Sequence, residues 1–400
     1  MMFVKMALIF ALIILLLACK RPLSQAMLGG LAATAVFYRI LPLDMLRLTG
    51  KVLTNWSSLS VLLSLYLITF LQRILESRSQ IRLAQEDLNG LFHNRRINII
   101  GACLFIGLLP SAASMLLCAE LVKNATDGYL KPKEQAFVAS WFRHIPESVL
   151  PTYSAVLLML SLSGVDTATF MAGMLPPVLF LGALGYFVYL RRVPTSVDTP
   201  NSTDRFADFR HLLAHLWSLI LILVLILLFH FEVVTAVLVS ILLSAVVYHI
   251  SVPEWKQFVV SAFEKNMLLN TFLVLVLQEF LSSTGVLPEL PAVLGKLPLP
   301  TYFIFGLLFF LVTLISGSTA AIAMGTPLAF AALPGGAPFM VYLMCMAHAA
   351  SQLSPTHVCL VVASDYFHIP LGGLIRKTVP IALSFCVLVT VYYHLLLLFS

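Results

Sequence analysis

The feature that most constrains this chain is a succession of a dozen apolar stretches, each near the length that crosses a lipid bilayer. Short polar connections separate them, and a transmembrane helix needs about 20 mainly apolar residues. Only 10% of the 400 residues are charged, whereas a soluble domain carries about a quarter charged residues. The sequence therefore predicts an all-α polytopic membrane protein.

The apolar stretches form two sets with the same order and similar lengths. In the first half they cover 3–19, 23–38, 57–74, 97–122, 145–163 and 168–190. In the second half they cover 211–229, 232–250, 267–283, 302–328, 338–362 and 377–398. Repetition of segments in the same order favours a duplication.

Short motifs recur in the same register. A shift of about 206 residues places Leu108-Leu109-Pro110-Ser111 on Leu314-Ile315-Ser316-Gly317, as a duplicated chain would. A slightly smaller shift places Pro151-Thr152-Tyr153 on Pro355-Thr356-His357. We therefore expect three parts: a first membrane repeat at 1–192, a cytoplasmic linker at 193–209 and a second membrane repeat at 210–400.

The placement of lysine and arginine indicates how the two repeats are oriented. If 97–122 and 302–328 are re-entrant hairpins, each half crosses the membrane five times and the second half is inverted. Of the 24 basic residues, 19 then lie on the cytoplasmic side, including Lys20, Arg21 and Arg143, as the positive-inside rule requires. The sequence thus predicts about ten transmembrane helices plus two re-entrant hairpins in two inverted-topology repeats.

Charge and cysteine usage exclude two other classes of function. The net charge of +6 comes from basic residues scattered over the connections, so the positive-inside pattern explains it and no nucleic-acid partner is expected. The six cysteines form no CxxC pair and no His/Cys cluster at metal-ligand spacing. The sequence therefore predicts neither a disulfide framework nor a metal site.

Four polar, helix-breaking patches interrupt the apolar segments. They are Pro110–Ser114 and Ser316–Thr319 in the two expected hairpins, and Pro151–Tyr153 and Ser354–His357 in the segments that follow. Irregular backbone is tolerated within lipid only where protein or water surrounds it. The ends of half-helices bind anionic groups at their N-termini and Na+ at their C-termini.

These patches supply the candidate substrate-binding residues. Close helix packing, with Ser and Thr bonded to their own helix, is the alternative explanation for any single patch. Their matching positions in both halves favour a binding site. The candidates are Ser111, Ser114, Thr152, Ser316, Ser318, Thr319, Thr356 and His357.

Few titratable residues lie in the apolar segments, and such residues are usually functional in membranes. His144 and Glu147 enter the fifth segment, and His348 and His357 lie in the eleventh. Because histidine titrates near neutral pH, these four are candidates for proton or ion coupling. A neutral histidine that satisfies a buried backbone group is the alternative. No cofactor is expected beyond Na+ as a coupling ion.

The motifs also carry a family resemblance. The stretch Leu353–Leu360, followed by Asp365-Tyr366-Phe367, resembles the late motif of the family known as domain of unknown function 401. Gly107–Pro110 and Trp141–Ile145 look like the same family, so the resemblance covers most of the chain. It departs at Ser111–Ser114, where the family has a glycine-rich patch.

The resemblance implies a carrier. The family is similar in layout to the ion transporter superfamily, whose members move carboxylates and other anions, usually with Na+ or H+. We therefore expect a multi-pass secondary active transporter of a small organic anion in the inner membrane, and not an enzyme. Transporters of this layout often dimerise, which leaves a homodimer open.

Two alternatives remain from the sequence. A lipid or polyprenyl-phosphate carrier or flippase would also have re-entrant hairpins and a basic cytoplasmic face that attracts anionic headgroups. An intramembrane hydrolase is the weaker alternative, with Ser318 and His348 as a dyad. No HExxH or GxSxG motif supports such an enzyme.

Overall fold

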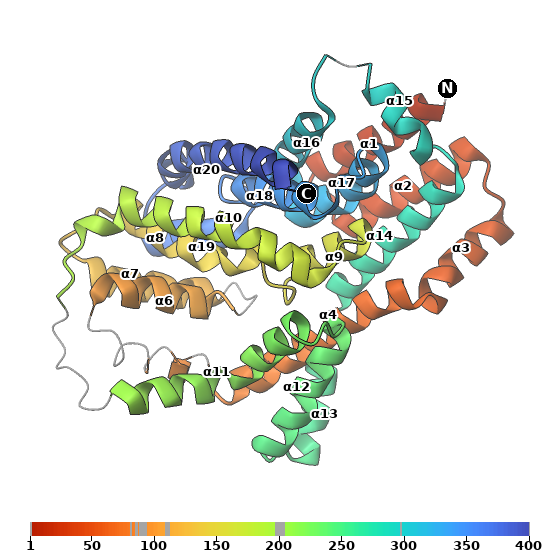
Figure 1. Cartoon of the computed structure of the whole chain (residues 1–400). Helices are drawn as coiled ribbons and strands as arrows, with labels where there is room; N and C mark the ends of the chain where they lie inside the picture. Colours follow the sequence, from red (N-terminus) through yellow and green to blue (C-terminus); the bar gives the residue numbers. More distant parts are fainter. Residues whose placement is uncertain are drawn as a thin grey trace.

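The computed structural model describes residues 2–80, 82–84, 87, 94–108, 113–196, 205–296 and 298–399. The regular elements of these residues are all helices (Figure 1), and no strand occurs among them. Within the described chain, five helices are long and apolar enough to cross a membrane: Trp56–Ser77, Thr167–Val188, Phe206–Leu227, Lys265–Ser283 and Leu371–Leu398. Shorter apolar helices accompany them. The prediction of an all-helical, multi-pass membrane protein is confirmed.

The two halves of the chain contain helices in the same order. The first half has α1 (Met2–Ala18), α2 (Leu23–Tyr38), α3 (Pro42–Thr54), α4 (Trp56–Ser77), α6 (Arg95–Ile106), α7 (Ala113–Thr126), α8 (Pro132–His144), α9 (Ser154–Ser163) and α10 (Thr167–Val188). The second half has α11 (Arg205–Leu227), α12 (Val233–Val247), α13 (Val252–Ser261), α14 (Lys265–Ser283), α15 (Leu290–Leu294), α16 (Thr301–Ser316), α17 (Ser318–Ala332), α18 (Gly336–Ser351), α19 (Val358–Tyr366) and α20 (Leu371–Phe399).

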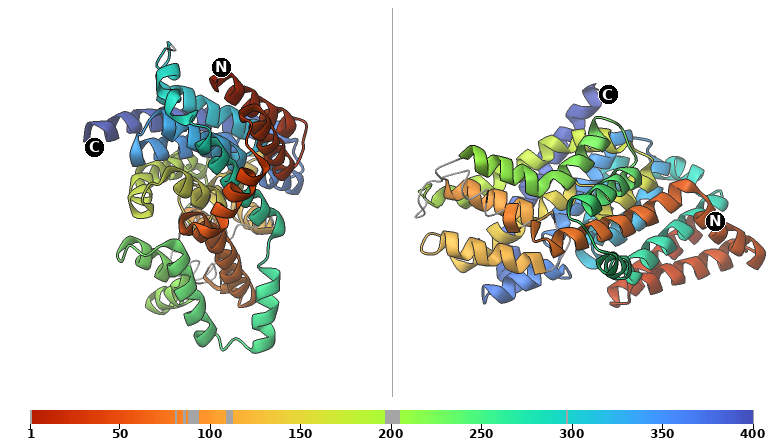
Figure 2. Two further views of the ribbon diagram at one scale, coloured as in Figure 1. Left: turned by 90° about the vertical axis from the view of Figure 1, so that its right-hand side faces the viewer. Right: turned by 90° about the horizontal axis from the view of Figure 1, so that it is seen from below.

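Helices of one half pack against helices of the other in reciprocal pairs. Helix α2 packs on α14, and α4 packs on α12. Likewise α9 packs on α17 and α7 on α19, while α10 packs on α18 and α8 on α20. Figures 1 and 2 show the yellow helices of the first half beside the blue helices of the second. Each of these pairings has a counterpart in which the halves are exchanged.

Two helices are interrupted at corresponding places. Helix α8 ends at His144, and after a short 3-10 turn at Pro146–Ser148 the next helix begins at Ser154. Helix α18 ends at Ser351, and α19 begins at Val358. Pro151 and Pro355 lie in these non-helical segments. Proline lacks the N–H that a continuous helix needs, so it favours an interruption there. The sequence predicted both interruptions from these prolines.

Helices α16 and α17 form a hairpin that turns on a single residue. They pack against each other, and Gly317 alone separates them. Its backbone has φ of 84° and ψ of 161°, a combination that is essentially restricted to glycine. In the first half, α6 and α7 also pack together. The connection between them at 109–112, with Ser111, lies outside the described residues, as does 197–204 of the expected linker.

Helix α8 corrects one sequence-based expectation. The sequence analysis found no apolar stretch between 122 and 145, and the inverted topology therefore made this part of the chain, with Arg143, a cytoplasmic connection. Instead α8 is a helix whose residues from Glu134 to His144 are all buried. Its polar groups find partners inside the protein: Trp141 Nε1, for example, donates to the carbonyl of Leu181 at 2.8 Å. Hydropathy alone misses such a helix.

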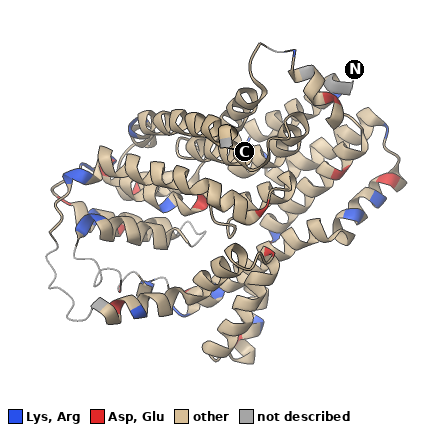
Figure 3. Cartoon of the chain, viewed as in Figure 1, with Lys and Arg blue, Asp and Glu red and all other residues tan. Residues whose placement is uncertain are grey.

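Charged residues are otherwise sparse along the helices and gather near their ends (Figure 3). Arg143 also lies near a helix end but is buried, although the sequence analysis counted it with the basic residues on the cytoplasmic side. It lies at the end of α8 with only 2% of its surface exposed. A buried arginine is costly unless it is paired, so its surroundings mark the interior of the protein as polar at this point.

Candidate functional site

A cavity of about 670 Å³ lies where the α16–α17 junction meets the break between α18 and α19. Its lining is rich in hydroxyl groups and backbone that is free of helical hydrogen bonds. The structure brings six sequence-predicted residues together in this lining: Glu147, Ser316, Ser318, Thr319, Thr356 and His357. Ser351, Ser354 and Cys359, which the sequence analysis did not select, line the same cavity.

Two basic residues also line this cavity. Lys20 and Arg21, in the connection between α1 and α2, are exposed and belong to the lining. No acidic residue other than Glu147 lines it. This part of the described structure therefore presents a positive field to a solute that enters the cavity.

The hairpin and the break are joined by a side chain. Ser354 Oγ donates to the carbonyl of Leu314 in the last turn of α16 at 2.9 Å. Such a carbonyl has no intrahelical partner, since α16 ends two residues later. Ser354 Oγ also lies 2.9 Å from Thr356 Oγ1. The hydroxyl of Ser316, by contrast, is buried and has no hydrogen-bond partner in the described structure.

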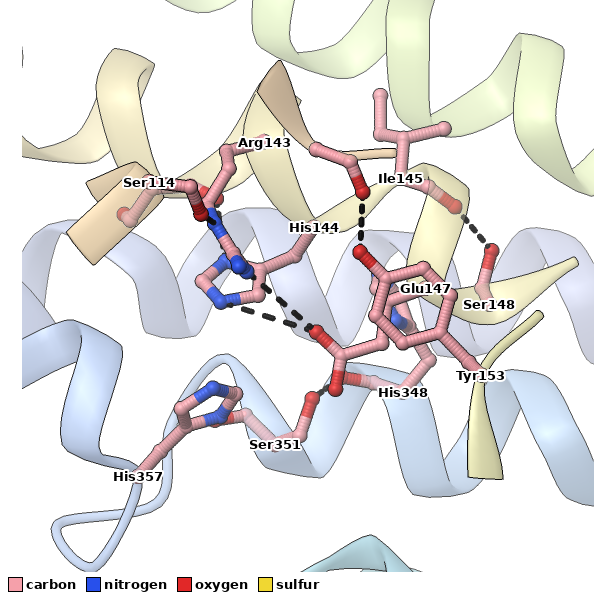
Figure 4. A network of polar contacts seen from close by, with 12 residues as sticks. Ser114, Arg143, His144, Ile145, Glu147, Ser148, Tyr153, His348, Ser351 and His357 are labelled. Carbon is pink, nitrogen blue, oxygen red and sulfur yellow. Dashed lines mark hydrogen bonds and ion pairs between the residues drawn. The ribbon is translucent and has the colours of Figure 1, made fainter. Parts of the chain in front are cut away.

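The cavity extends to a histidine pair contributed by both halves of the chain. The rings of His144 and His357 meet edge to face, with centroids 4.7 Å apart (Figure 4). Nδ1 of His144 contacts the carbonyl of Ser140, and Nδ1 of His357 lies 3.1 Å from the carbonyl of Ser351. These contacts orient both rings, with each Nδ1 directed at a backbone carbonyl.

Arg143, Glu147 and Ser114 form a charged network beside the histidines. Arg143 Nε donates to Ser114 Oγ at 3.0 Å, and its Nη1 lies 3.8 Å from Glu147 Oε2 (Figure 4). The same carboxylate oxygen is 3.8 Å from His144 Nε2. Ser114 thus contacts the network through Arg143 and does not line the cavity.

A further hydrogen bond within the first half lies next to this network. The hydroxyl of Tyr153 donates to the carbonyl of Gly107 at the end of α6. A Cβ added to Gly107 would collide with the carbonyl of Arg143. The end of α6, the end of α8 and the segment before α9 therefore meet at one point, and only glycine fits at position 107.

Two predicted site residues lie elsewhere. Thr152 lines two other cavities, of about 330 and 310 Å³, which adjoin α4 and α11 respectively. His348 is buried within α18, with its ring 6.5 Å from that of Phe385. Neither lines the cavity that holds the six candidates named above.

The sequence analysis missed Arg143, Cys359, Ser351 and Ser354 as site residues. Arg143 directly precedes His144 in a motif that was noticed, and Ser354 precedes Pro355 in a predicted break. For these two residues the available signal was their position next to a recognised motif or helix break. No sequence signal connects His144 with Cys359, because these residues come from opposite halves.

Comparisons with known proteins bear on the fold and the family of this chain. None of the curated proteins matches the chain. The crystal structure of the YdaH transporter of Alcanivorax borkumensis, described as having an unusual topology, is similar with a TM-score of 0.64 and 15% sequence identity. The similarity covers 89% of this chain and 90% of that chain. The family described as "Protein of unknown function (DUF401)" matches residues 3–396. The chain therefore belongs to the DUF401 family.

Proposed function

We propose that this protein is a secondary active transporter of a small organic anion of the carboxylate type. The observation that carries the proposal is the cavity at which a hairpin turn and a helix break meet, lined by hydroxyls, an imidazole and two basic residues. The fold supports it, because a transporter has a similar structure. The protein would act as a multi-pass protein of the inner membrane and not as an enzyme.

Two helix N-termini favour an anion at this place. Helix α17 begins at Ser318 and α19 begins at Val358, and the first turns of both line the cavity. The first N–H groups of a helix have no intrahelical partner, and the helix dipole adds about half a positive charge. Together with Lys20 and Arg21, these ends provide a site for a carboxylate.

The C-terminal ends of α16 and α18 provide the opposite field. Ser316 and Ser351 are the last residues of these helices and line the same cavity. Unpaired carbonyls and hydroxyls at half-helix ends are ligands for Na+ in transporters of this kind. The coupling ion is Na+ or H+, and the experiment below separates the two.

The reciprocal packing supports two inverted repeats, 1–192 and 210–400, joined by a linker at 193–209. A two-fold relation makes each contact between halves occur twice with the partners exchanged, as α9 with α17 and α7 with α19 do. In this proposal α6–α7 and α16–α17 are the re-entrant hairpins. Movement of the hairpins and broken helices against the remaining helices then gives alternating access.

Ligand-dependent stability of the reconstituted protein tests the proposal first. Dicarboxylates, monocarboxylates and amino acids are screened with Na+ or K+ at two pH values, because a ligand that binds the native state raises its apparent stability. A shift that needs Na+ identifies Na+ coupling, and one that depends only on pH identifies H+. Polyprenyl phosphates or phospholipids as the sole stabilising compounds would instead support lipid transport.

Uptake into proteoliposomes then tests the site. Ser318→Ala and Thr356→Val should each lower uptake of the stabilising anion at least about tenfold, which corresponds to about 1.4 kcal/mol. Ser384→Ala is the matched control, because its hydroxyl bonds its own helix at Pro380 on exposed α20 surface. Equal uptake by all three variants and the wild type would reject the cavity as the binding site.

A further inference from the structure

Three metal-ligating side chains converge beside the cavity, and two of them, His357 and Cys359, belong to its lining. His144, His357 and Cys359 each offer one ligand atom, and these atoms all lie within 4.8 Å of one another. His144 comes from the end of α8, whereas His357 and Cys359 come from the start of α19. The group forms only when the two interrupted helices meet, so the spacing of residues along the chain does not reveal it.

The two imidazoles are prepared for metal binding. Each has Nδ1 at a backbone carbonyl, of Ser140 in one case and Ser351 in the other. In this arrangement Nδ1 carries the proton and Nε2 keeps its lone pair. Histidines that ligate metals usually show the same outer contact, which fixes the tautomer and the ring orientation.

The free nitrogen of His144 has no other function in the described structure. His144 is fully buried, and its Nε2 has no hydrogen-bond partner. A buried polar atom without a partner costs free energy. The carboxylate oxygen Oε2 of Glu147 lies 3.8 Å from Nε2, which is too far for a hydrogen bond. A metal ion bound to Nε2 would give this nitrogen a partner.

We infer that His144, His357 and Cys359 bind one transition-metal ion of the Zn2+ type, with Glu147 next to it. Two imidazoles and a thiolate are ligands that Zn2+ prefers. Donor atoms around tetrahedral zinc are about 3.3 to 3.8 Å apart. The three ligand atoms lie within 4.8 Å of one another here, so binding a metal requires the start of α19, which carries His357 and Cys359, to move slightly toward His144. The fourth position faces the cavity.

The charges around the site do not balance when a divalent metal ion is bound. Arg143 lies beside Glu147 and opposes a cation. The Cys359 thiolate and the Glu147 carboxylate supply two negative charges against a divalent ion and this arginine. One positive charge remains unbalanced, and an anion in the cavity neutralises it. The inference does not depend on transport, since metal binding is measured on the purified protein alone.

Cobalt binding to the purified full-length protein tests the inference. Metal-free protein is titrated with Co2+, because a tetrahedral cobalt–thiolate site absorbs in both the visible and near-ultraviolet regions, and Zn2+ then displaces the cobalt. One equivalent with a thiolate charge-transfer band is expected. Cys359→Ser should abolish that band, and His144→Gln should weaken affinity more than about 100-fold, beyond the loss typical of outer-shell changes.

Matched variants distinguish this site from others. Cys386→Ser and His368→Gln change a cysteine and a histidine that lie outside the cluster and should bind Co2+ as the wild type does. X-ray absorption of the zinc-loaded wild type needs no variant, and it should show one sulfur and two imidazoles around the metal. A ligand shell of oxygen only, or binding unaffected by Cys359→Ser, would overturn the inference.

Discussion

Ser354 Oγ donates to the carbonyl of Leu314 at 2.9 Å, so a side-chain hydrogen bond joins the break between α18 and α19 to the end of α16. Ser354 is buried, with 1% of its surface exposed. The contact connects two segments that both line the cavity. Hairpin and break are therefore expected to move together.

Ser354→Ala tests that connection. The change leaves the Leu314 carbonyl without its side-chain partner, which should lower the free energy of unfolding by about 1 to 3 kcal/mol. We expect a lower melting temperature in detergent and faster hydrogen exchange at the start of α17. Ser384→Ala, on exposed surface of α20, should leave both unchanged. Unaltered exchange in the hairpin of Ser354→Ala would show that the hydroxyl does not hold it.

Arg143→Gln leaves Glu147 without its cationic neighbour inside the protein. Breaking a fully buried pair by removing one partner typically costs about 3 to 5 kcal/mol. The distance of 3.8 Å and the 22% exposure of the Glu147 side chain favour the lower end of that range or less. The double variant with Glu147→Gln should recover part of the loss. Melting curves of the single and double variants give the coupling energy. Arg47→Gln, which removes an exposed pair with Asp44, should change stability by less than about 1 kcal/mol.

Gly107→Ala should be among the most damaging small substitutions. The added methyl group would collide with the carbonyl of Arg143, and packed interiors tolerate little extra volume. We expect a large drop in melting temperature and loss of the monodisperse protein. Gly182→Ala is the control, because a Cβ there meets no atom within 4 Å and alanine favours a helix by about 1 kcal/mol. Equal stability of the two variants would contradict the close approach at position 107.

Glu254 gives a pH-dependent prediction outside the membrane-spanning segments. Arg78 Nη1 donates to its carboxylate at 2.8 Å, and this bond, with those from Ser251, lowers the pKa of Glu254 from 4.5 to about 2. Because the folded pKa is depressed, the stabilisation is fully present above pH 4.5. It is lost as the pH falls towards 2, where the carboxylate gains its proton in both states.

Glu254→Gln should therefore be less stable than the wild type at neutral pH, with the difference shrinking between pH 4.5 and about 2. Fluorescence of the neighbouring Trp255, whose ring packs 5.0 Å from Phe70, reports unfolding of this region. Asp44→Asn serves as a control for a general effect of acid. A difference that stays constant across this pH range would exclude Glu254 as its source.

The sequence predicted the parts of the fold that local chemistry determines. Pro151 and Pro355 lie at helix breaks because each follows or precedes short polar residues, whereas Pro327 and Pro380 lie inside α17 and α20. Gly317 marks a turn within an apolar run. Helix α8 was missed because its buried polar residues lower the hydropathy, although inside the protein they have partners. Arg143 was assigned to the cytoplasm for the same reason: hydropathy treats every arginine as solvated. Contacts between His144 and Cys359 depend on how the two halves pack, which local sequence does not encode.

The position of Lys20 and Arg21 on the cavity lining has a kinetic consequence. Low-dielectric walls concentrate the field of these charges along the cavity, and such focusing raises the association rate of an oppositely charged solute. Mobile salt screens exposed charges beyond about 8 Å at physiological ionic strength. Added salt should therefore slow the entry of an anion while leaving its departure from the inner hydroxyls almost unaffected. In the proposed transporter, the connection between α1 and α2 sets the speed of capture, and the helix ends further inside set the choice of solute.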